Sequence, residues 1–266
     1  MFCIDNSREK IKSLFDGFYD SIMFSYFDGI YGNGFCDNCD RPQTAVIQAG
    51  DFYFVAGKIQ LQHEIMELVG DNRWAVIVPD TIKWFDALNS KEKPLILVDR
   101  FHTCPPTEGF NIEEIQKNVD KICLHKGFKL EKIDEYYYNK ALESHWSEFF
   151  VNNYKCFDDY SKHGFGYIIT KDKEIISGAS TYSYYENGVE LELATHENYR
   201  KMGFASITAS SFILECMRRR LIPHWDARNL TSLKIAEKIG FTLRDKYPAF
   251  EFEQSCFGKW KEIIWK

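Results

Sequence analysis

The chain has 266 residues, a mass of 31.3 kDa and a formal net charge of −6, with 45% apolar and 16% aromatic residues. This acidic balance argues against binding to the phosphate backbone of DNA or RNA, which usually requires a basic domain. No apolar run approaches the roughly 18 residues that cross a bilayer, and residues 1–6 lack the layout of a signal peptide. We therefore expect a soluble, cytoplasmic protein with a large core and with neither nucleic acid nor membrane as a partner.

The first 130 residues are predicted to form one α/β domain. Apolar residues at helical spacing cover residues 7–31, and a glycine-rich turn region follows up to residue 42. Strands are expected at Thr44–Ala49 and at residues 52–56, joined by a tight turn at Gly50-Asp51. Two more strands, at residues 74–78 and 94–98, flank a helix at 81–88, and a further helix is expected at 111–125.

The eight cysteines are spread over the whole chain, which is not the pattern of a small disulfide-stapled domain. Most are expected to be buried thiols. Cys36 and Cys39 form a C-x-x-C pair, which can ligate zinc or cycle as a dithiol. No second such pair or close histidine pair completes a four-ligand site in the sequence, so we favour a structural role for the pair and expect no metal.

A polar passage at residues 129–140 is the predicted boundary to a second domain, residues 131–266. An aromatic helix is expected at residues 143–160, followed by strands at 167–170, 174–185 and 189–195, with a turn at residues 171–173 between the first two strands. Asn187-Gly188 is a strong hairpin signal before the third of these strands. A helix at 203–219, a strand at 223–227 and a helix at 229–239 follow. Gly240 is a glycine signal that ends the last of these helices, and Phe241 begins the last strands. This order predicts a mixed sheet flanked by helices.

The most informative segment joins the strand at 189–195 to the helix at 203–219: residues 199–205 read YRKMGFA. A glycine turn at a helix start leaves backbone N–H groups unpaired at the positive end of the helix dipole. Such a turn binds phosphate or pyrophosphate without a large basic patch. A ligand with phosphates is therefore expected here, the alternative being a plain strand-to-helix turn.

Three features of the second half resemble the GNAT superfamily of N-acetyltransferases. Residues 200–205, RKMGFA, match the Arg/Gln-x-x-Gly-x-Gly/Ala signature for acetyl-CoA. Residues 229–232, NLTS, and 237–241, EKIGF, match the start and the end of the family's next helix, and the paired strands before the signature fall in the expected order. The resemblance implies a GNAT sheet in the second domain, with acetyl-CoA as co-substrate and a small-molecule amine as acceptor.

A narrower likeness rests on residues 190–195, ELELAT, on Tyr199-Arg200 and on residues 223–229, PHWDARN. These segments look like the subfamily that includes the zwittermicin A self-resistance acetyltransferase. Members of that group carry an additional N-terminal α/β domain, so residues 1–130 are candidates for a degenerate GNAT-like fold. Dimers are common in the superfamily, and a homodimer is among the expected assemblies.

The resemblance assigns the acetyl-CoA contacts residue by residue. Backbone groups of the strand before the signature would pair with the pantetheine arm, the turn would hold the pyrophosphate, and the start of the last helix would contact the co-substrate as well. The cofactor-binding residues so implied are Leu193, Ala194, Thr195, Arg200, Lys201, Met202, Gly203, Phe204, Ala205, Asn229 and Ser232. For Asn229 a plain helix N-cap is the alternative role.

Acetylation of an amine requires a base that removes a proton from the nitrogen. Glu190 and Glu192 share one face of their strand, because side chains repeat every two residues. Glu190 is the favoured catalytic residue and Glu192 the second choice, against the alternative of a solvated strand face. His224 and Asp226 on the adjoining strand are further candidates for a base or a substrate anchor.

One position departs from the family pattern. Many GNAT enzymes have a tyrosine just before the Glu-Lys-x-Gly-Phe ending, which protonates the departing thiolate, and here that position is Ala236. Ser232, Tyr247 or water are the replacements considered. The missing tyrosine leaves open a second hypothesis, a non-catalytic acyl-CoA-binding sensor or interaction module.

Overall fold

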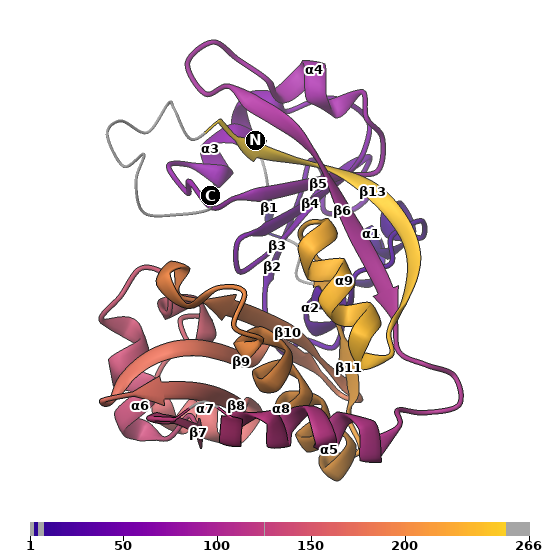
Figure 1. Cartoon of the computed structure of the whole chain (residues 1–266). Helices are drawn as coiled ribbons and strands as arrows, with labels where there is room; N and C mark the ends of the chain where they lie inside the picture. Colours follow the sequence, from indigo (N-terminus) through magenta and orange to yellow (C-terminus); the bar gives the residue numbers. More distant parts are fainter. Residues whose placement is uncertain (1–2, 5–7, 125, 254–266) are drawn as a thin grey trace. The chain divides into compact units, whose positions relative to one another are not determined.

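The computed structural model describes residues 3–4, 8–124 and 126–253, with contacts that divide the chain into two compact units (Figure 1). The first unit takes in the described residues up to Arg100 and from Lys246 onward, and the second is Phe101–Asp245. The predicted domain limits, 1–130 and 131–266, stay a prediction. His125, the predicted end of a helix, and most of the N-terminal segment lie outside the described residues. Within the described part of the chain, every helix is too short or too polar to span a bilayer.

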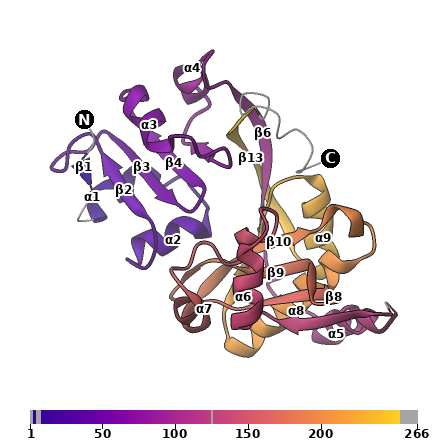
Figure 2. The same ribbon diagram turned by 90° about the vertical axis from the view of Figure 1, so that its left-hand side faces the viewer.

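The first unit is built on a mixed sheet, whose strands β2, β3 and β4 lie side by side in Figure 2. Neighbouring strands pair in the order β1-β2-β3-β4-β5-β13, antiparallel except for the parallel pair β4–β5. The hairpin between β3 and β4 turns at Gly50, with φ of 59°, as predicted. The strands are β1 (Cys3–Ile4), β2 (Asn33–Cys36), β3 (Thr44–Ala49), β4 (Phe52–Gly57), β5 (Val76–Pro79) and the far end of β13 (Thr242–Phe252).

The helices of the first unit are short. They are α1 (Glu9–Lys12), the 3-10 turn η1 (Ser13–Phe15), α2 (Ser21–Phe27), α3 (Gln62–Val69) and α4 (Trp84–Leu88). The prediction of one helix over residues 7–31 is wrong at residues 16–20, where the chain leaves the helical conformation before α2, and beyond Phe27, where α2 ends. Helix α3 was missed, since only Ile65 and Val69 of its eight residues are buried.

The second unit contains a five-stranded sheet in the order β11-β10-β9-β8-β7. All pairs are antiparallel except β10–β11, which are parallel. Asp172 and Lys173, with φ of 51° and 68°, form the turn between β8 and β9 that the sequence predicts. The five strands of this sheet are β7 (Phe128–Lys132), β8 (Gly166–Lys171), β9 (Glu174–Tyr185), β10 (Gly188–Thr195) and β11 (Ile222–His224). The unit also contains β12 (Asp226–Ala227), which lies outside this sheet. Strand β6 (Leu95–Cys104) enters this unit at Phe101 and pairs with β12.

Helices cover both faces of this sheet. They are α5 (Ile112–Asp120), the 3-10 turn η2 (Lys121–Leu124), α6 (Glu135–Leu142), η3 (Glu148–Phe150), α7 (Phe157–His163), η4 (Glu197–Tyr199), α8 (Phe204–Arg219) and α9 (Leu230–Ile239). Ile168 and Ile175 face a cluster formed with α6, η3 and α7, whereas the next residue in each strand, Ile169 and Ile176, faces α8. The mixed α/β class predicted from the sequence is confirmed.

The predicted continuous helix at residues 143–160 is wrong. Its place is taken by η3, irregular chain and α7, which begins only at Phe157. The aromatic side chains are buried as expected, but tertiary hydrogen bonds hold the backbone: Ser180 Oγ donates to Phe150 O at 2.6 Å, and Tyr154 Oη donates to Thr181 O at 3.2 Å. The polar passage at residues 129–140 contains most of β7 and most of α6, and both elements belong to the second unit.

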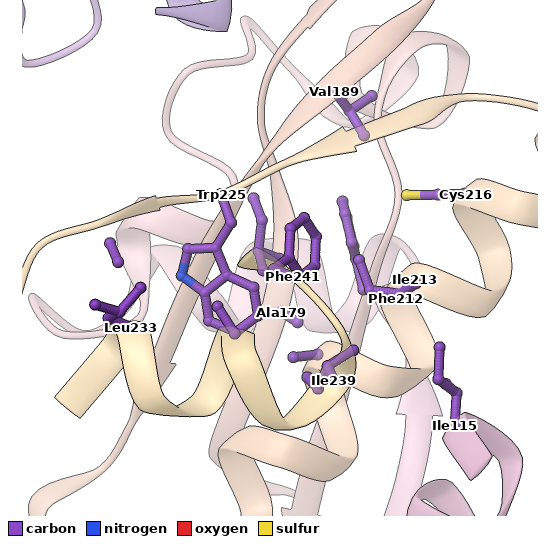
Figure 3. Packing of buried hydrophobic residues seen from close by; sticks show 14 of the residues in the cluster. Ile115, Ala179, Val189, Phe212, Ile213, Cys216, Trp225, Leu233, Ile239 and Phe241 are labelled. Atoms are coloured by element: carbon purple, nitrogen blue, oxygen red, sulfur yellow. The ribbon is translucent and has the colours of Figure 1, made fainter. Parts of the chain in front are cut away.

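The largest buried cluster of the second unit lies between the sheet, α8 and α9 (Figure 3). Trp225 and Phe241 meet at its centre with ring centroids 5.7 Å apart, and Leu233 and Ile239 of α9 complete it. Gly240 ends α9 with φ of 116°, which is the predicted glycine C-cap.

The two units share one order of elements. In the second unit the β9–β10 hairpin is followed by α8 and by β11 parallel to β10. In the first, the β3–β4 hairpin is followed by α3 and by β5 parallel to β4. Helix α3 has eight residues and α8 has sixteen. This agrees with the prediction of a degenerate GNAT-like fold in the N-terminal part.

The cysteines differ from the expectation in two respects. Cys36 and Cys216 are buried free thiols, but Cys123 and Cys156 are exposed, and Cys39 takes part in a disulfide bond. The sulfur of Cys36 lies 3.9 Å from that of Cys39. Among the described residues, no group of three or more His, Cys, Asp or Glu side chains is placed to hold a metal ion.

Candidate active site

Strands β10 and β11 separate after a short parallel stretch. They pair at Gly188, Val189 and Glu190, opposite residues 222–224. The chain then leaves β10, and β12 pairs instead with His102 and Phe101 of β6. Strand β10 continues along β9 to Thr195, so residues 191–195 have a strand neighbour on one side only. The sequence predicted a single strand at 223–227, and the break at Trp225 is the correction. The result is an open strand edge that includes the predicted residues Leu193, Ala194 and Thr195.

The open edge leads directly into the predicted phosphate turn. Lys201 and Gly203 both adopt the left-handed conformation, with φ of 65° and 83°, and α8 starts at Phe204. A Cβ atom built on Gly203 would meet no heavy atom within 4 Å, so the backbone there borders open space. Helix geometry leaves the first N–H groups of α8 without carbonyl partners in the helix. The turn thus has the form of an anion site at a helix N-terminus.

The side chains around this turn have different surroundings. Lys201 and Met202 are exposed, and Arg200 donates from Nε to the carbonyl of Thr195 at 3.4 Å. Phe204 is buried in the core, with its ring 4.8 Å from that of Phe128, so only its backbone can reach a ligand at the turn. Ala205 lies half-buried in the first turn of α8.

Asn229 caps α9. Its Oδ1 accepts the N–H of Ser232 at 3.0 Å, and the Ser232 hydroxyl accepts from Nε1 of Trp225 at 3.0 Å. The capping role considered for Asn229 is therefore present. Contact of either residue with a co-substrate stays a prediction.

Glu190 sits where β11 and β12 part. Its side chain is 5% exposed, and Oε1 accepts the N–H of Asp226 at 2.7 Å. Its neighbours Val189 and Leu191 belong to the cluster against α8, so alternation turns Glu190 and Glu192 toward the α6 and α7 face. Glu192 is half-buried. The structure therefore brings one carboxylate to the vertex of the opened strands and a second one further along the open edge.

Comparison with protein families decides the identity. The model of the GNAT acetyltransferase family matches residues 12–250, which is most of the chain. The chain belongs to the GNAT acetyltransferase family. The match runs through both units, so the N-terminal unit is part of the family's architecture in this chain.

Individual relatives agree with this family. A GCN5-related N-acetyltransferase-like protein from Streptococcus suis has 31% identity and a TM-score of 0.85, covering 92% of this chain and 98% of that one. An uncharacterized N-acetyltransferase of Bacillus subtilis, YdfB, is 25% identical, with 91% of this chain and 94% of that protein covered. A tandem GNAT protein from the clavulanic acid biosynthesis pathway, 10% identical with a TM-score of 0.50, covers 95% and 98% of the two chains and shares the fold alone.

This GNAT chain has no tyrosine at the position that often serves as acid. Ala236 is fully buried in the cluster of Trp225 and Phe241, so it faces the core. Of the two side chains that could replace this acid, Ser232 lies at the start of α9, where its hydroxyl accepts a hydrogen bond from Nε1 of Trp225. Tyr247 belongs to the first unit, where its hydroxyl accepts from Arg100 Nε at 3.2 Å.

A histidine–carboxylate pair escaped the sequence analysis. His102 is 8% exposed, and its Nδ1 lies 2.6 Å from Oδ1 of Asp245. In the β6–β12 ladder His102 stands opposite Asp226, the residue whose N–H binds Glu190. The two partners are 143 positions apart in the chain, and nothing in the local sequence connects them.

His224 is placed as a neutral structural group. It is 9% exposed, and its Nε2 lies 2.8 Å from the hydroxyl of Tyr185. Burial lowers the pKa of His224 from its usual 6.5 to about 4. Because the folded pKa is below the unfolded one, the contribution of His224 to stability is complete above pH 6.5 and is lost as the pH falls toward 4.

We therefore expect the free energy of unfolding of the His224→Gln variant to fall less than that of wild type as the pH is lowered from 7 to 4. Protonation of the wild-type side chain costs up to about 3 kcal/mol between neutral pH and pH 4. Urea unfolding at pH 7 and pH 4.5 measures the difference. His63→Gln is the matched control, because His63 is exposed and should leave the curve unchanged. Equal pH dependence of His224→Gln and wild type would contradict the assignment.

Proposed function

We propose that this chain transfers the acetyl group of acetyl-CoA directly to a primary amine of a small molecule. The observation that carries the proposal is the open edge of β10 at residues 191–195, which ends at the left-handed turn before α8. A pantetheine arm has alternating amide donors and acceptors, which can pair with a free strand edge as an added strand does. The turn at Gly203 would then take the pyrophosphate.

The carboxylate of Glu190, where β11 and β12 part, supplies the base. In this proposal Glu190 accepts the proton of the attacking ammonium group, directly or through a water molecule. The freed amine nitrogen bonds to the thioester carbonyl carbon, and backbone N–H groups of the open edge stabilise the negative oxygen that forms. The carbon–sulfur bond breaks as the nitrogen gives up its second proton, and that proton reaches the departing thiolate through water or the Ser232 hydroxyl group. Arg200, Lys201 and the turn hold the phosphates throughout.

A second function is favoured by Ala236. A chain without the usual acid could bind acyl-CoA and act as a sensor or interaction module. A thiolate is a fair leaving group with a thiol pKa of about 8–9, so a dedicated acid is helpful rather than essential. Glu190 and Glu192 therefore favour an enzyme over a non-catalytic binding module.

The deciding experiment is product formation. The purified chain is incubated with acetyl-CoA and a panel of amines (a polyamine, an aminoglycoside, an amino acid and a short peptide), and free CoA is quantified by chromatography. Colorimetric thiol reagents are unsuitable, because Cys123 and Cys156 are exposed free thiols. Amine-dependent release supports the enzyme. Thermal stabilisation by acetyl-CoA without release on any amine would instead favour the binding module, and absence of stabilisation would reject both.

A further inference from the structure

Two cysteine sulfurs meet in the C-x-x-C segment of the first unit, which acetyl transfer does not use. Cys36 is the last residue of β2, which lies beside β3 in Figure 2, and Cys39 lies in the loop that follows. Cys36 is a thiol outside any disulfide bond, whereas Cys39 is disulfide-bonded. The Cys36 thiol donates to the Cys39 sulfur across 3.9 Å. A thiol is therefore directed at one sulfur of a disulfide bond.

The two residues between the cysteines fix the loop that holds these sulfurs together. Asp37 Oδ1 accepts the N–H groups of Gln43 and Thr44 at 2.8 Å and 3.0 Å. Asn38 Oδ1 accepts the N–H group of Asp40 at 2.8 Å. These bonds involve neither sulfur atom, so they can persist when the bonding between the sulfurs changes. The contact between the two cysteines is thus built into the backbone of the loop.

The two cysteines differ in their access to solvent. Cys36 is 1% exposed, whereas Cys39 is half-buried. Lys10 Nζ donates to the carbonyl oxygen of Cys39 at 2.8 Å, and a nearby ammonium group favours the thiolate form of a cysteine. An accessible sulfur can bond to an external thiol, and a neighbouring thiol can then displace that group. Cys39 suits the first of these roles and Cys36 the second.

We propose that Cys36 and Cys39 form a thiol–disulfide exchange site for low-molecular-weight disulfides. The Cys36 thiol loses its proton to solvent and attacks the Cys39 sulfur. A Cys36–Cys39 bond forms, the bond between Cys39 and its present partner breaks, and the departing thiolate takes up a proton. One disulfide bond replaces another, so this step needs no oxidant. The site is independent of the proposed acetyl transfer.

With an external disulfide the same pair completes a two-electron reaction. The Cys39 thiolate opens the external disulfide, which leaves one half bonded to Cys39 and releases the other half as a thiol. Cys36 then displaces the bonded half, which leaves as a second thiol. The two cysteines are thereby oxidised to a disulfide, and the external disulfide is reduced to two thiols.

The test is disulfide mapping of the full chain in glutathione buffer. The chain is equilibrated with reduced and oxidised glutathione at pH 8, quenched with acid, labelled with N-ethylmaleimide in denaturant and digested with trypsin without reduction. Both cysteines stay in one peptide, residues 13–58, because trypsin does not cleave between Arg41 and Pro42. We expect most of this peptide in wild type to carry a Cys36–Cys39 bond, with neither label nor glutathione attached.

Replacing Cys36 with Ser should raise the amount of glutathione bonded to Cys39 about tenfold, because no neighbouring thiol competes with external glutathione. Cys36→Ala repeats the test without burying a hydroxyl group, and urea unfolding shows whether each variant keeps the fold. Cys123→Ser is the control, because it removes an exposed thiol of the second unit and should map like wild type.

Three results would overturn the exchange site. The first is a wild-type Cys36 that is labelled by N-ethylmaleimide in every glutathione buffer. The second is an equal amount of glutathione on Cys39 in wild type and in the folded Cys36 variants. The third is zinc that copurifies with wild type and is lost in these variants, which would make the pair part of a metal site. Each result leaves the proposed acetyl transfer standing.

Discussion

Replacing Glu190 with Gln is expected to lower kcat for amine acetylation by about 10²- to 10⁴-fold, the usual range for loss of a general base. The glutamine keeps an oxygen that can accept the N–H of Asp226, so the vertex between β11 and β12 should stay intact. Only the basic group is removed. Steady-state kinetics at saturating acetyl-CoA and amine measures the effect as a fall in kcat. Unchanged urea unfolding would show that the fold is kept.

Glu192→Gln is the matched control on the same strand face. Glu192 is only half-buried and lies beyond the vertex, so we expect this variant to retain most of the wild-type kcat. A large loss at Glu192 with little at Glu190 would exchange the two roles. If both variants turn over like wild type, the base is elsewhere, and the His102–Asp245 pair becomes the next group to test.

Local sequence signals predicted the parts of the site that depend on backbone geometry. Gly203 at a helix start, Asn229 before α9 and Gly240 after it are each read from one residue and its spacing, and the structure has the expected cap or turn at all three. The sequence did not predict the parts of the site that depend on contacts between residues far apart in the chain. The break at Trp225 arises because Asp226 and Ala227 pair with β6, more than 120 positions earlier in the chain.

The prediction of a helix at residues 143–160 is wrong for the same reason, contacts with residues far away in the chain. Its aromatic residues follow a helical spacing, yet their hydroxyl and carbonyl groups bind β9, as Tyr154 does with Thr181. Tertiary hydrogen bonds of this kind outweigh helix propensity, which amounts to tenths of a kcal/mol per residue. The sequence therefore predicts the turn that would bind the phosphates of the co-substrate better than it predicts the site that would bind the amine acceptor.

Gly203→Ala is expected to weaken acetyl-CoA binding by about 10- to 100-fold, as for the loss of one strong hydrogen bond to a charged group. The side chain would meet no protein atom, so the loss would come from the blocked approach of the pyrophosphate to the backbone. The change also forces alanine into φ of 83°, which costs about 1–2 kcal/mol of stability. Gly127→Ala separates the two effects, because Gly127 has φ of 84° and equally open surroundings but lies outside the turn. Both variants should lose similar stability in urea, and Gly203→Ala alone should lose affinity in calorimetry. An equal affinity in the two variants would mean that the phosphates bind away from this turn.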